Sequence, residues 1–153
     1  MEDKKDNKPK NTLRFNTNKV DYTSLSPLAQ ELEARVFMFG ACKYSRDNWK
    51  LGNVTIEDTC MGMLKSLMRH LQAYRKGEIF DPESRLPHMT HIVWNANRIN
   101  DFMFHGVTHG KDGKDLFEQP LLYELPPIPT DDNLEEEFGC IPLSRKKEYE
   151  QKT

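Results

Sequence analysis

Apolar residues recur at helical spacing in three segments of the chain. The first segment begins where Ser26 precedes Pro27, a pair typical of a helix N-cap followed by proline in the first turn. The apolar positions around and after this pair lie mostly three or four residues apart: Leu25, Leu28, Leu32, Val36 and Phe39. The pattern predicts a helix from Pro27 to Gly40, because glycine favours a helix end.

The second and third segments show the same period. Thr55 and Asp58 resemble a capping box, which predicts a long helix that ends before Gly77. We expect its buried side to contain Ile56, Cys60, Met63, Leu64, Leu67, Leu71 and Tyr74. A third helix is predicted from about Pro87 to His105, with an apolar side made of Met89, Ile92, Val93, Ala96, Ile99 and Met103. Since no segment alternates with period two over a useful length, the pattern predicts an all-α fold.

The two ends of the chain differ from this helical region, which spans residues 24–106. Residues 1–23 are rich in Lys, Asn and Asp and nearly free of aliphatic side chains, so we expect them to be flexible. Residues 107–153 contain four prolines between positions 120 and 129, which are incompatible with an inner strand or a helix there. They are predicted to form an extended, Pro-rich and charged arm. Three residues could attach the arm to the body or to another subunit: Leu121, Leu122 and Tyr123.

Composition excludes several classes of protein. The net charge of −2 leaves no basic field for a nucleic-acid polymer, so we expect none as a partner. No apolar run approaches the roughly 18 residues that cross a bilayer, so we expect no membrane attachment and a cytoplasmic protein. The three cysteines are odd in number and widely spaced, which indicates reduced thiols rather than disulfides or a zinc site.

Two histidines open the third predicted helix, directly behind an acidic loop. His88 and His91 are three residues apart and therefore share a helix face, which Asn95 continues. Asp81 and Glu83 precede them in the loop. The pattern indicates carboxylates and imidazoles at one site. The alternative is that His88 caps the helix and His91 is a hydrogen-bonded core residue.

Three strings of sequence together resemble a known enzyme family. They are FGACKYSRDNW, MRHLQAYRKGE and DPESRLPHMTHIVWNA, found in this order between Leu28 and Phe104. They resemble the phage domain of dATP/dGTP diphosphohydrolases, the MazZ-type relatives of the all-α MazG nucleotide pyrophosphohydrolases. The resemblance implies a metal-dependent enzyme that cleaves dGTP or dATP between the α- and β-phosphates and releases the monophosphate and pyrophosphate. In phages that replace adenine with diaminopurine, the dGMP would feed synthesis of the unusual base.

The chain departs from the family pattern at two places. Arg85 stands where glycine is expected after DPES, and it either adds a phosphate contact or only reshapes the turn. MazG relatives have the metal motifs ExxE on one helix and ExxD on the next. In this chain His88 and His91 stand where ExxD is expected, and no ExxE is present around His70.

Hydrolysis of a triphosphate requires divalent cations, of which Mg²⁺ prefers oxygen ligands, whereas added imidazoles favour Mn²⁺. The candidate metal ligands are Glu31, His70, Glu78, Asp81, His88 and His91. The candidate catalytic residues are Glu31, His70, Asp81 and His91. Some of these have a plainer explanation, because Glu31 also fits an exposed helix charge, Glu78 a helix-end residue and Asp81 a turn cap.

The connection after the first helix supplies candidates for substrate binding. Lys43, with Arg69 from the second helix, is predicted to clamp the phosphates. Their positive charges would neutralise the part of the negative phosphate charge that the bound metal ions do not. Tyr44 and Trp49 are predicted to stack on a purine, and Asn48 to read its edge. An aromatic residue in a connection between helices also fits a core position.

Three helices alone make a thin bundle, so we expect a homodimer or homotetramer that completes the core. The apolar positions expected to be exposed for this purpose are Phe37, Phe39, Met61 and Met68, whereas Met89 is expected in the core.

A different hypothesis is a non-catalytic phage module that binds a host protein through its acidic, Pro-rich tail. An HD-type metal phosphohydrolase is less favoured, because no His-Asp dipeptide occurs in the chain.

Overall fold

The chain divides into two compact units, one formed by Met1–Tyr22 with Pro126–Thr153 and the other by Thr23–Leu125. The computed structural model describes residues 19–53, 55–106, 116–118, 120–130 and 132–139. In the described part of the first unit, the helix is α4 (Leu134–Phe138).

The second unit is helical, and the site lies within it. Its α-helices are α1 (Pro27–Lys43), α2 (Ile56–Arg75) and α3 (His88–His105), and its short 3-10 helices are η1 (Asn48–Leu51) and η2 (Leu116–Glu118). No strand occurs among the described residues, so the predicted all-α fold is confirmed. No helix of the described segments is both long and apolar enough to cross a membrane.

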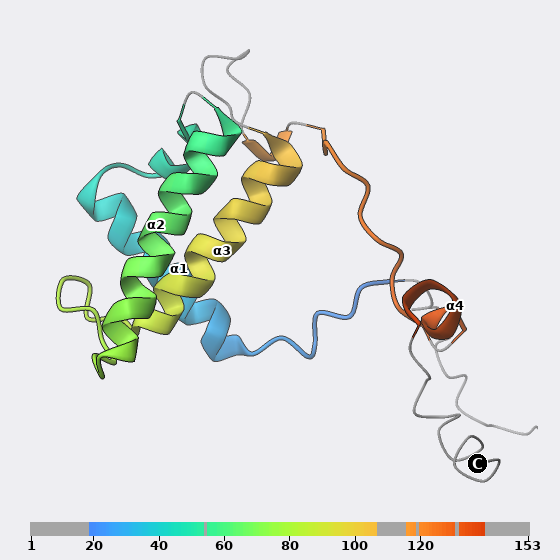
Figure 1. Cartoon of the computed structure of the whole chain (residues 1–153), viewed down its shortest axis with the longest axis horizontal. Coiled ribbons are helices and arrows are strands. Elements are labelled where there is room, and N and C mark those ends of the chain that lie inside the picture. The colour runs from blue at the N-terminus through green and yellow to red at the C-terminus, as the bar shows by residue number, and fades with distance from the viewer. Residues whose placement is uncertain (1–18, 54, 107–115, 119, 131, 140–153) are drawn as a thin grey trace, which may run out of the picture. The chain divides into compact units, whose positions relative to one another are not determined.

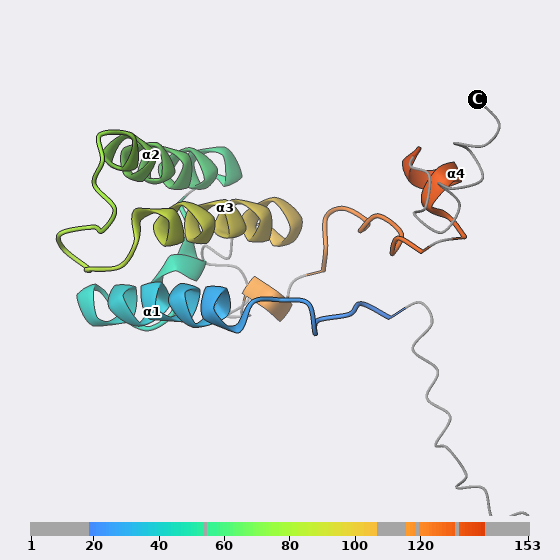
Figure 2. The same cartoon turned by 90° about the horizontal axis from the view of Figure 1, so that it is seen from below.

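Helix α3 lies between α1 and α2 (Figures 1 and 2). Helices α2 and α3 run antiparallel side by side, and residues 76–87 join them at one end of the bundle (Figure 1). Any side chain on the inner faces of α3 therefore meets another helix.

The predicted helix starts are confirmed by their caps. The Ser26 side chain accepts a hydrogen bond from the Ala29 N–H at 3.2 Å, and Thr55 Oγ1 accepts one from the Asp58 N–H at 3.0 Å. These bonds satisfy backbone donors that have no partner within the helix. Helix α3 begins after Pro87 without a side-chain cap, so the alternative that His88 caps this helix is wrong.

Gly40 does not end the first helix, contrary to the prediction. The helix continues to Lys43, because the Tyr44 N–H still donates to the Gly40 carbonyl at 2.9 Å. A glycine inside a helix costs only about 1 kcal/mol relative to alanine, which the following helical residues offset. Gly106 does end α3, with φ +85°.

The inner face of α3 is polar. His88, His91, Asn95 and Arg98 are buried along one stripe that ends at the fully buried Phe102. Met89 was expected in the core and is 45 % exposed, so that prediction is wrong. The same correction applies to four other apolar positions expected on buried sides: Leu64, Tyr74, Val93 and Met103.

Aromatic rings fill the space where α1, η1 and α3 meet. The Phe37 ring lies 5.6 Å from that of Trp49 and 5.5 Å from that of Trp94. Phe37 is therefore packed rather than exposed, which corrects the prediction, and Phe39 is also only partly exposed. Met61 and Met68 are 50 % and 44 % exposed, as predicted.

Part of the predicted C-terminal arm packs on the helical unit. The Leu122 N–H donates to the Phe104 carbonyl at 2.6 Å, and the Tyr123 ring lies 5.9 Å from that of Phe104. Leu116 is fully buried. The flexible N-terminus and the extended arm stay predictions, because residues 1–18, 107–115 and 140–153 lie outside the described segments.

Replacing Phe102 should destabilise the helical unit strongly. Phe102→Ala removes a fully buried ring, and we expect a loss of about 3–5 kcal/mol in the free energy of unfolding. The control Asn100→Ala changes an exposed residue of the same helix and should stay within about 0.5 kcal/mol of the parent. Chemical denaturation measures both, and equal effects would contradict this description of the core.

Candidate functional site

The loop before α3 is built around Asp81. The Asp81 N–H donates to the Leu86 carbonyl at 2.9 Å, and the Arg85 N–H donates back to the Asp81 carbonyl at 2.8 Å. The Asp81 carboxylate also accepts the Ser84 N–H at 2.7 Å, as an aspartate at the start of a turn commonly does. The His88 N–H donates to the Ile79 carbonyl at 2.9 Å and closes the loop against the start of α3. These bonds fix the carboxylate beside the histidines of α3.

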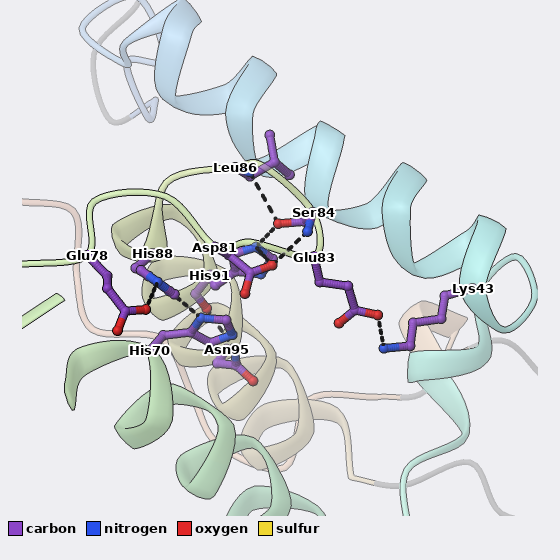
Figure 3. Close-up of polar contacts among 10 residues, drawn as sticks. All are labelled: Lys43, His70, Glu78, Asp81, Glu83, Ser84, Leu86, His88, His91 and Asn95. Atoms are coloured by element: carbon purple, nitrogen blue, oxygen red, sulfur yellow. Dashed lines mark hydrogen bonds and ion pairs between the residues drawn. The ribbon is translucent and has the colours of Figure 1, made fainter. Parts of the chain in front are cut away.

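Three imidazoles and this carboxylate form a cluster, defined here as His70, Asp81, His88 and His91 (Figure 3). His70 comes from α2, and its Nδ1 lies 2.8 Å from Nδ1 of His88. The ring of His70 stacks on that of His91, with centroids 4.4 Å apart and planes 5° from parallel. One ligand atom from each of His70, Asp81 and His88 lies within 4.8 Å of the others. These separations suit ligands that converge on one cation.

The protonation states also suit metal binding. Burial, and then the neighbouring His91, lower the pKa of His70 from its ordinary 6.5 to about 4, and burial lowers the pKa of His91 as well. Although burial opposes it, hydrogen bonds from Ser84 keep the pKa of Asp81 below its usual 3.8. At neutral pH His70 and His91 therefore offer neutral imidazole nitrogens and Asp81 an ionised carboxylate, the forms that bind metal ions.

Contacts around the cluster hold its side chains in place. Ser84 Oγ lies 2.7 Å from His91 Nε2, and Asn95 Nδ2 donates to the His91 carbonyl at 2.7 Å. His88 Nε2 is buried without a hydrogen-bond partner among the described residues, and the nearest carboxylate, that of Glu78, is 3.8 Å away. An unpartnered buried nitrogen in a group of imidazoles and a carboxylate fits a metal-binding site.

A cavity of about 700 Å³ lies beside the cluster, and its size is that of a small-molecule site. Its lining includes three members of the cluster: His70, Asp81 and His91. It also includes all five residues predicted to bind substrate: Lys43, Tyr44, Asn48, Trp49 and Arg69. The structure thus brings segments that are distant in sequence to one cavity.

Glu31 is not brought to this cavity. Its carboxylate forms an ion pair with Arg35 one turn along α1, and more than half of each side chain is exposed. Glu33 points inward instead, where it accepts a hydrogen bond from Asn97 at 2.9 Å and lies 3.5 Å from Arg98. The geometry therefore gives Glu31 no contact with the proposed ligands.

Among the polar residues near the site that sequence reasoning missed, Arg46 and Ser84 make the most direct contribution. Arg46 adds a third cation to the cavity, and Ser84 contacts His91 from the loop. The spacing of Asp81 and Ser84 is that of a side-chain-capped turn, which could have drawn attention to Ser84. Arg46 lies within the string FGACKYSRDNW, but its spacing alone does not distinguish it from a surface charge.

Lys43 is already paired in this structure. Its ammonium lies 2.5 Å from the carboxylate of Glu83, so α1 is linked to the loop before α3 (Figure 3). The hydrogen bond to Glu83 raises the pKa of Lys43, which keeps the side chain charged at the cavity. An anionic ligand would compete with Glu83 for this cation.

Comparison with known proteins points to one family. The family model described as dATP/dGTP diphosphohydrolase, N-terminal, matches residues 9–112. The matched range contains the whole cluster and the lining of the cavity. No curated protein and no solved structure was found to match the chain.

Arg85→Gly should stabilise the protein. Arg85 has φ +61°, a left-handed conformation that costs a non-glycine residue about 1–2 kcal/mol, and it does not line the cavity. Because glycine also loses more chain entropy on folding, we expect a net gain of about 1 kcal/mol in the free energy of unfolding.

Thermal and chemical denaturation would measure the gain. Lys76→Gly, in the same connection but with φ −81°, is the control and should bring no gain. If Arg85→Gly instead lowered activity without raising stability, Arg85 would belong to the substrate site.

Proposed function

The chain belongs to the dATP/dGTP diphosphohydrolase family, and we propose that it hydrolyses purine deoxynucleoside triphosphates to the monophosphate and pyrophosphate with a bound divalent metal ion. The main support for the proposal is that the His70–Asp81–His88 group lies beside a cavity that is lined by cationic side chains. Family membership makes the protein an enzyme, so the alternative of a non-catalytic binding module loses its support.

The donor set fits a divalent ion. Two imidazoles and a carboxylate favour Mn²⁺ or a similar transition metal over Mg²⁺, which prefers oxygen ligands. We assign His70, Asp81 and His88 as the ligands, with Glu78 as an outer partner of His88. When bound, the ion would neutralise phosphate oxygens and orient the attacking water.

Lys43, Arg46 and Arg69 supply the remaining positive charge. All three line the cavity, so a triphosphate in it would meet cations beyond the metal site. Lys43 would exchange its partner Glu83 for a phosphate oxygen. This exchange replaces one ion pair by another and therefore opposes binding only weakly.

His91 is the candidate for proton transfer. It is neutral at neutral pH, lines the cavity and lies beside the ligands His70 and Asp81. Water that attacks phosphorus must lose a proton as the bond between the α- and β-phosphates breaks and pyrophosphate leaves. A neutral imidazole at this position can accept that proton.

The purine would lie against the connection after α1. Tyr44 is 68 % exposed and lines the cavity, so we propose that its ring stacks on the base. The Trp49 ring packs against Phe37, Trp94, Phe102 and Phe117, so its proposed role is to form the wall of the cavity as much as to stack. Asn48 remains the candidate for reading the purine edge.

We extend the proposal to phage nucleotide metabolism, in which the dGMP produced would supply synthesis of diaminopurine nucleotides. This extension depends only on the three sequence strings that resemble the MazZ-type enzymes. Assays with dGTP, dATP and the diaminopurine triphosphate would test it.

We also propose that the active form is a homodimer or homotetramer. Met61, Leu64 and Met68 form an apolar groove on α2 and are 41–50 % exposed. Large apolar patches on a soluble protein commonly mark contact surfaces. A second copy packed there would complete the core of the thin bundle.

Removal of the metal or of its ligands should abolish hydrolysis. We expect no turnover in excess chelator, recovery with Mn²⁺ or Mg²⁺, and a loss of at least ~10²-fold for His70→Ala and for Asp81→Ala. Release of pyrophosphate from a panel of deoxynucleoside triphosphates is the measurement. The control His105→Ala removes an imidazole outside the cluster and should keep turnover per folded molecule. Full activity in chelator would contradict the metal-dependent mechanism.

Charges placed on the α2 groove should separate the subunits. Met61→Glu combined with Met68→Glu would bury two carboxylates in the proposed interface, so the mass by light scattering should fall to that of a monomer. Leu28→Glu alters a residue of α1 that is 64 % exposed and should leave the mass unchanged. A parent protein that is already monomeric would disprove the oligomer.

A further inference from the structure

Gly40 lies within α1 at a position where the fold gives no reason for a glycine. Its φ is not left-handed, and outside its own helix an added Cβ would meet nothing within 4 Å among the described residues. Alanine would therefore fit there, and it favours a helix more than glycine does. A glycine that costs stability without relieving strain or a clash points to a requirement outside the fold.

The open space over Gly40 belongs to the cavity beside the cluster. Gly40 lines this cavity, as do Val36 one turn earlier on α1 and Lys43 and Tyr44 one turn later. Residues three and four positions apart are neighbours on a helix surface, so Gly40 adjoins both Lys43 and Tyr44. Because glycine has no side chain, it leaves a hollow between longer side chains in which a ligand can approach the helix backbone closely.

The two side chains that follow the hollow are assigned to different parts of the nucleotide. Lys43 is the proposed phosphate contact, and Tyr44 is the proposed stacking partner of the base. Lys43 Nζ lies 5.6 Å from the centroid of the Tyr44 ring, a short separation that the sugar of a nucleotide can bridge. Since the sugar is bonded to both the base and the phosphates, a nucleotide that makes both contacts would place its sugar near the residue that adjoins both.

We propose that the hollow over Gly40 is the deoxyribose subsite of the cavity, and that the absent side chain allows the sugar to pack against α1. This assignment rests on the proposed function and adds the place of the sugar to it. A methyl group at position 40 would occupy the space of the sugar and also strengthen the helix. The same substitution therefore has opposite effects on nucleotide binding and on stability.

Gly40→Ala tests the subsite on the full-length chain with Mg²⁺. Calorimetry measures the binding of dGMP and of inorganic pyrophosphate, and a thermal melt without ligand measures stability. We expect the melting temperature to rise by roughly 4 °C, because alanine favours the helix. The Kd for dGMP should rise at least ~10-fold, because the methyl group overfills the hollow when the sugar is present. Pyrophosphate has no sugar and should bind as it does to the parent.

Turnover of dGTP gives a second readout. The KM should rise in Gly40→Ala, whereas kcat should stay close to that of the parent, because Gly40 contacts no reacting atom.

Gly62→Ala is the matched control. Gly62 lies within α2 and does not line the cavity, and an added Cβ would meet Asn53 Nδ2 at 3.7 Å, an ordinary contact distance. This variant should also raise the melting temperature, and its affinity for dGMP should equal that of the parent.

Four results would overturn the subsite. They are a parent without affinity for dGMP, parental dGMP binding in Gly40→Ala, a lower melting temperature of this variant, and an equal loss of dGMP and pyrophosphate binding, which would indicate a distorted cavity. A parent that hydrolyses dGTP together with a Gly40→Ala variant of unchanged KM would refute the subsite and leave the proposed function standing. Conversely, dGMP binding that depends on Gly40 in a protein without turnover would support the subsite and refute the proposed function.

Discussion

The polar stripe buried on α3 is the constraint on which the rest of the structure depends. A helix placed between two others must bury a face on each side, and α3 buries His88, His91, Asn95 and Arg98. Buried polar groups lose the solvation of water and therefore need partners inside the protein. α2 provides His70, the loop before α3 provides Asp81 and Ser84, and α1 provides Glu33. The site is the place where one helix obtains these partners.

The two ends of the stripe meet this requirement differently. Arg98 remains charged in ion pairs with Asp101 at 3.0 Å and Glu33 at 3.5 Å, and its guanidinium lies 4.6 Å from the ring centroids of Phe37 and Trp49. Burial lowers the pKa of Arg98, but a guanidinium stays protonated in proteins. This end joins α1 and η1 to α3 and so builds the cavity wall. At the other end burial keeps the His91 ring neutral, and with it His70 of α2, which leaves nitrogen lone pairs available for a ligand.

Helix starts and the all-α fold could be predicted from sequence because they depend on local features, such as Ser26 with Pro27 and Thr55 with Asp58. The face of α3 that points toward the neighbouring helices could not be predicted in this way. Periodicity shows which residues share a face, whereas burial depends on what the neighbouring helices offer. Met89 was placed inside because it is apolar, yet the partners of His88 and His91 draw the polar side inward. Which of Glu31 and Glu33 points inward could not be predicted for the same reason, because it depends on where Asn97 and Arg98 lie.

The imidazoles of the cluster have an electrostatic consequence for the site. MazG-like motifs would place acidic side chains where this chain has His88 and His91, and each added carboxylate would repel both its neighbours and a triphosphate. With Asp81 as the ionised member of the cluster, a divalent ion there would keep a net positive charge. Lys43 and Arg69 at the same cavity would extend that positive field along the phosphates. Neutral ligands also tolerate the burial that α3 imposes, whereas several buried carboxylates would bind protons instead of metal. The packing of α3 and the chemistry of the site therefore favour the same residue, histidine.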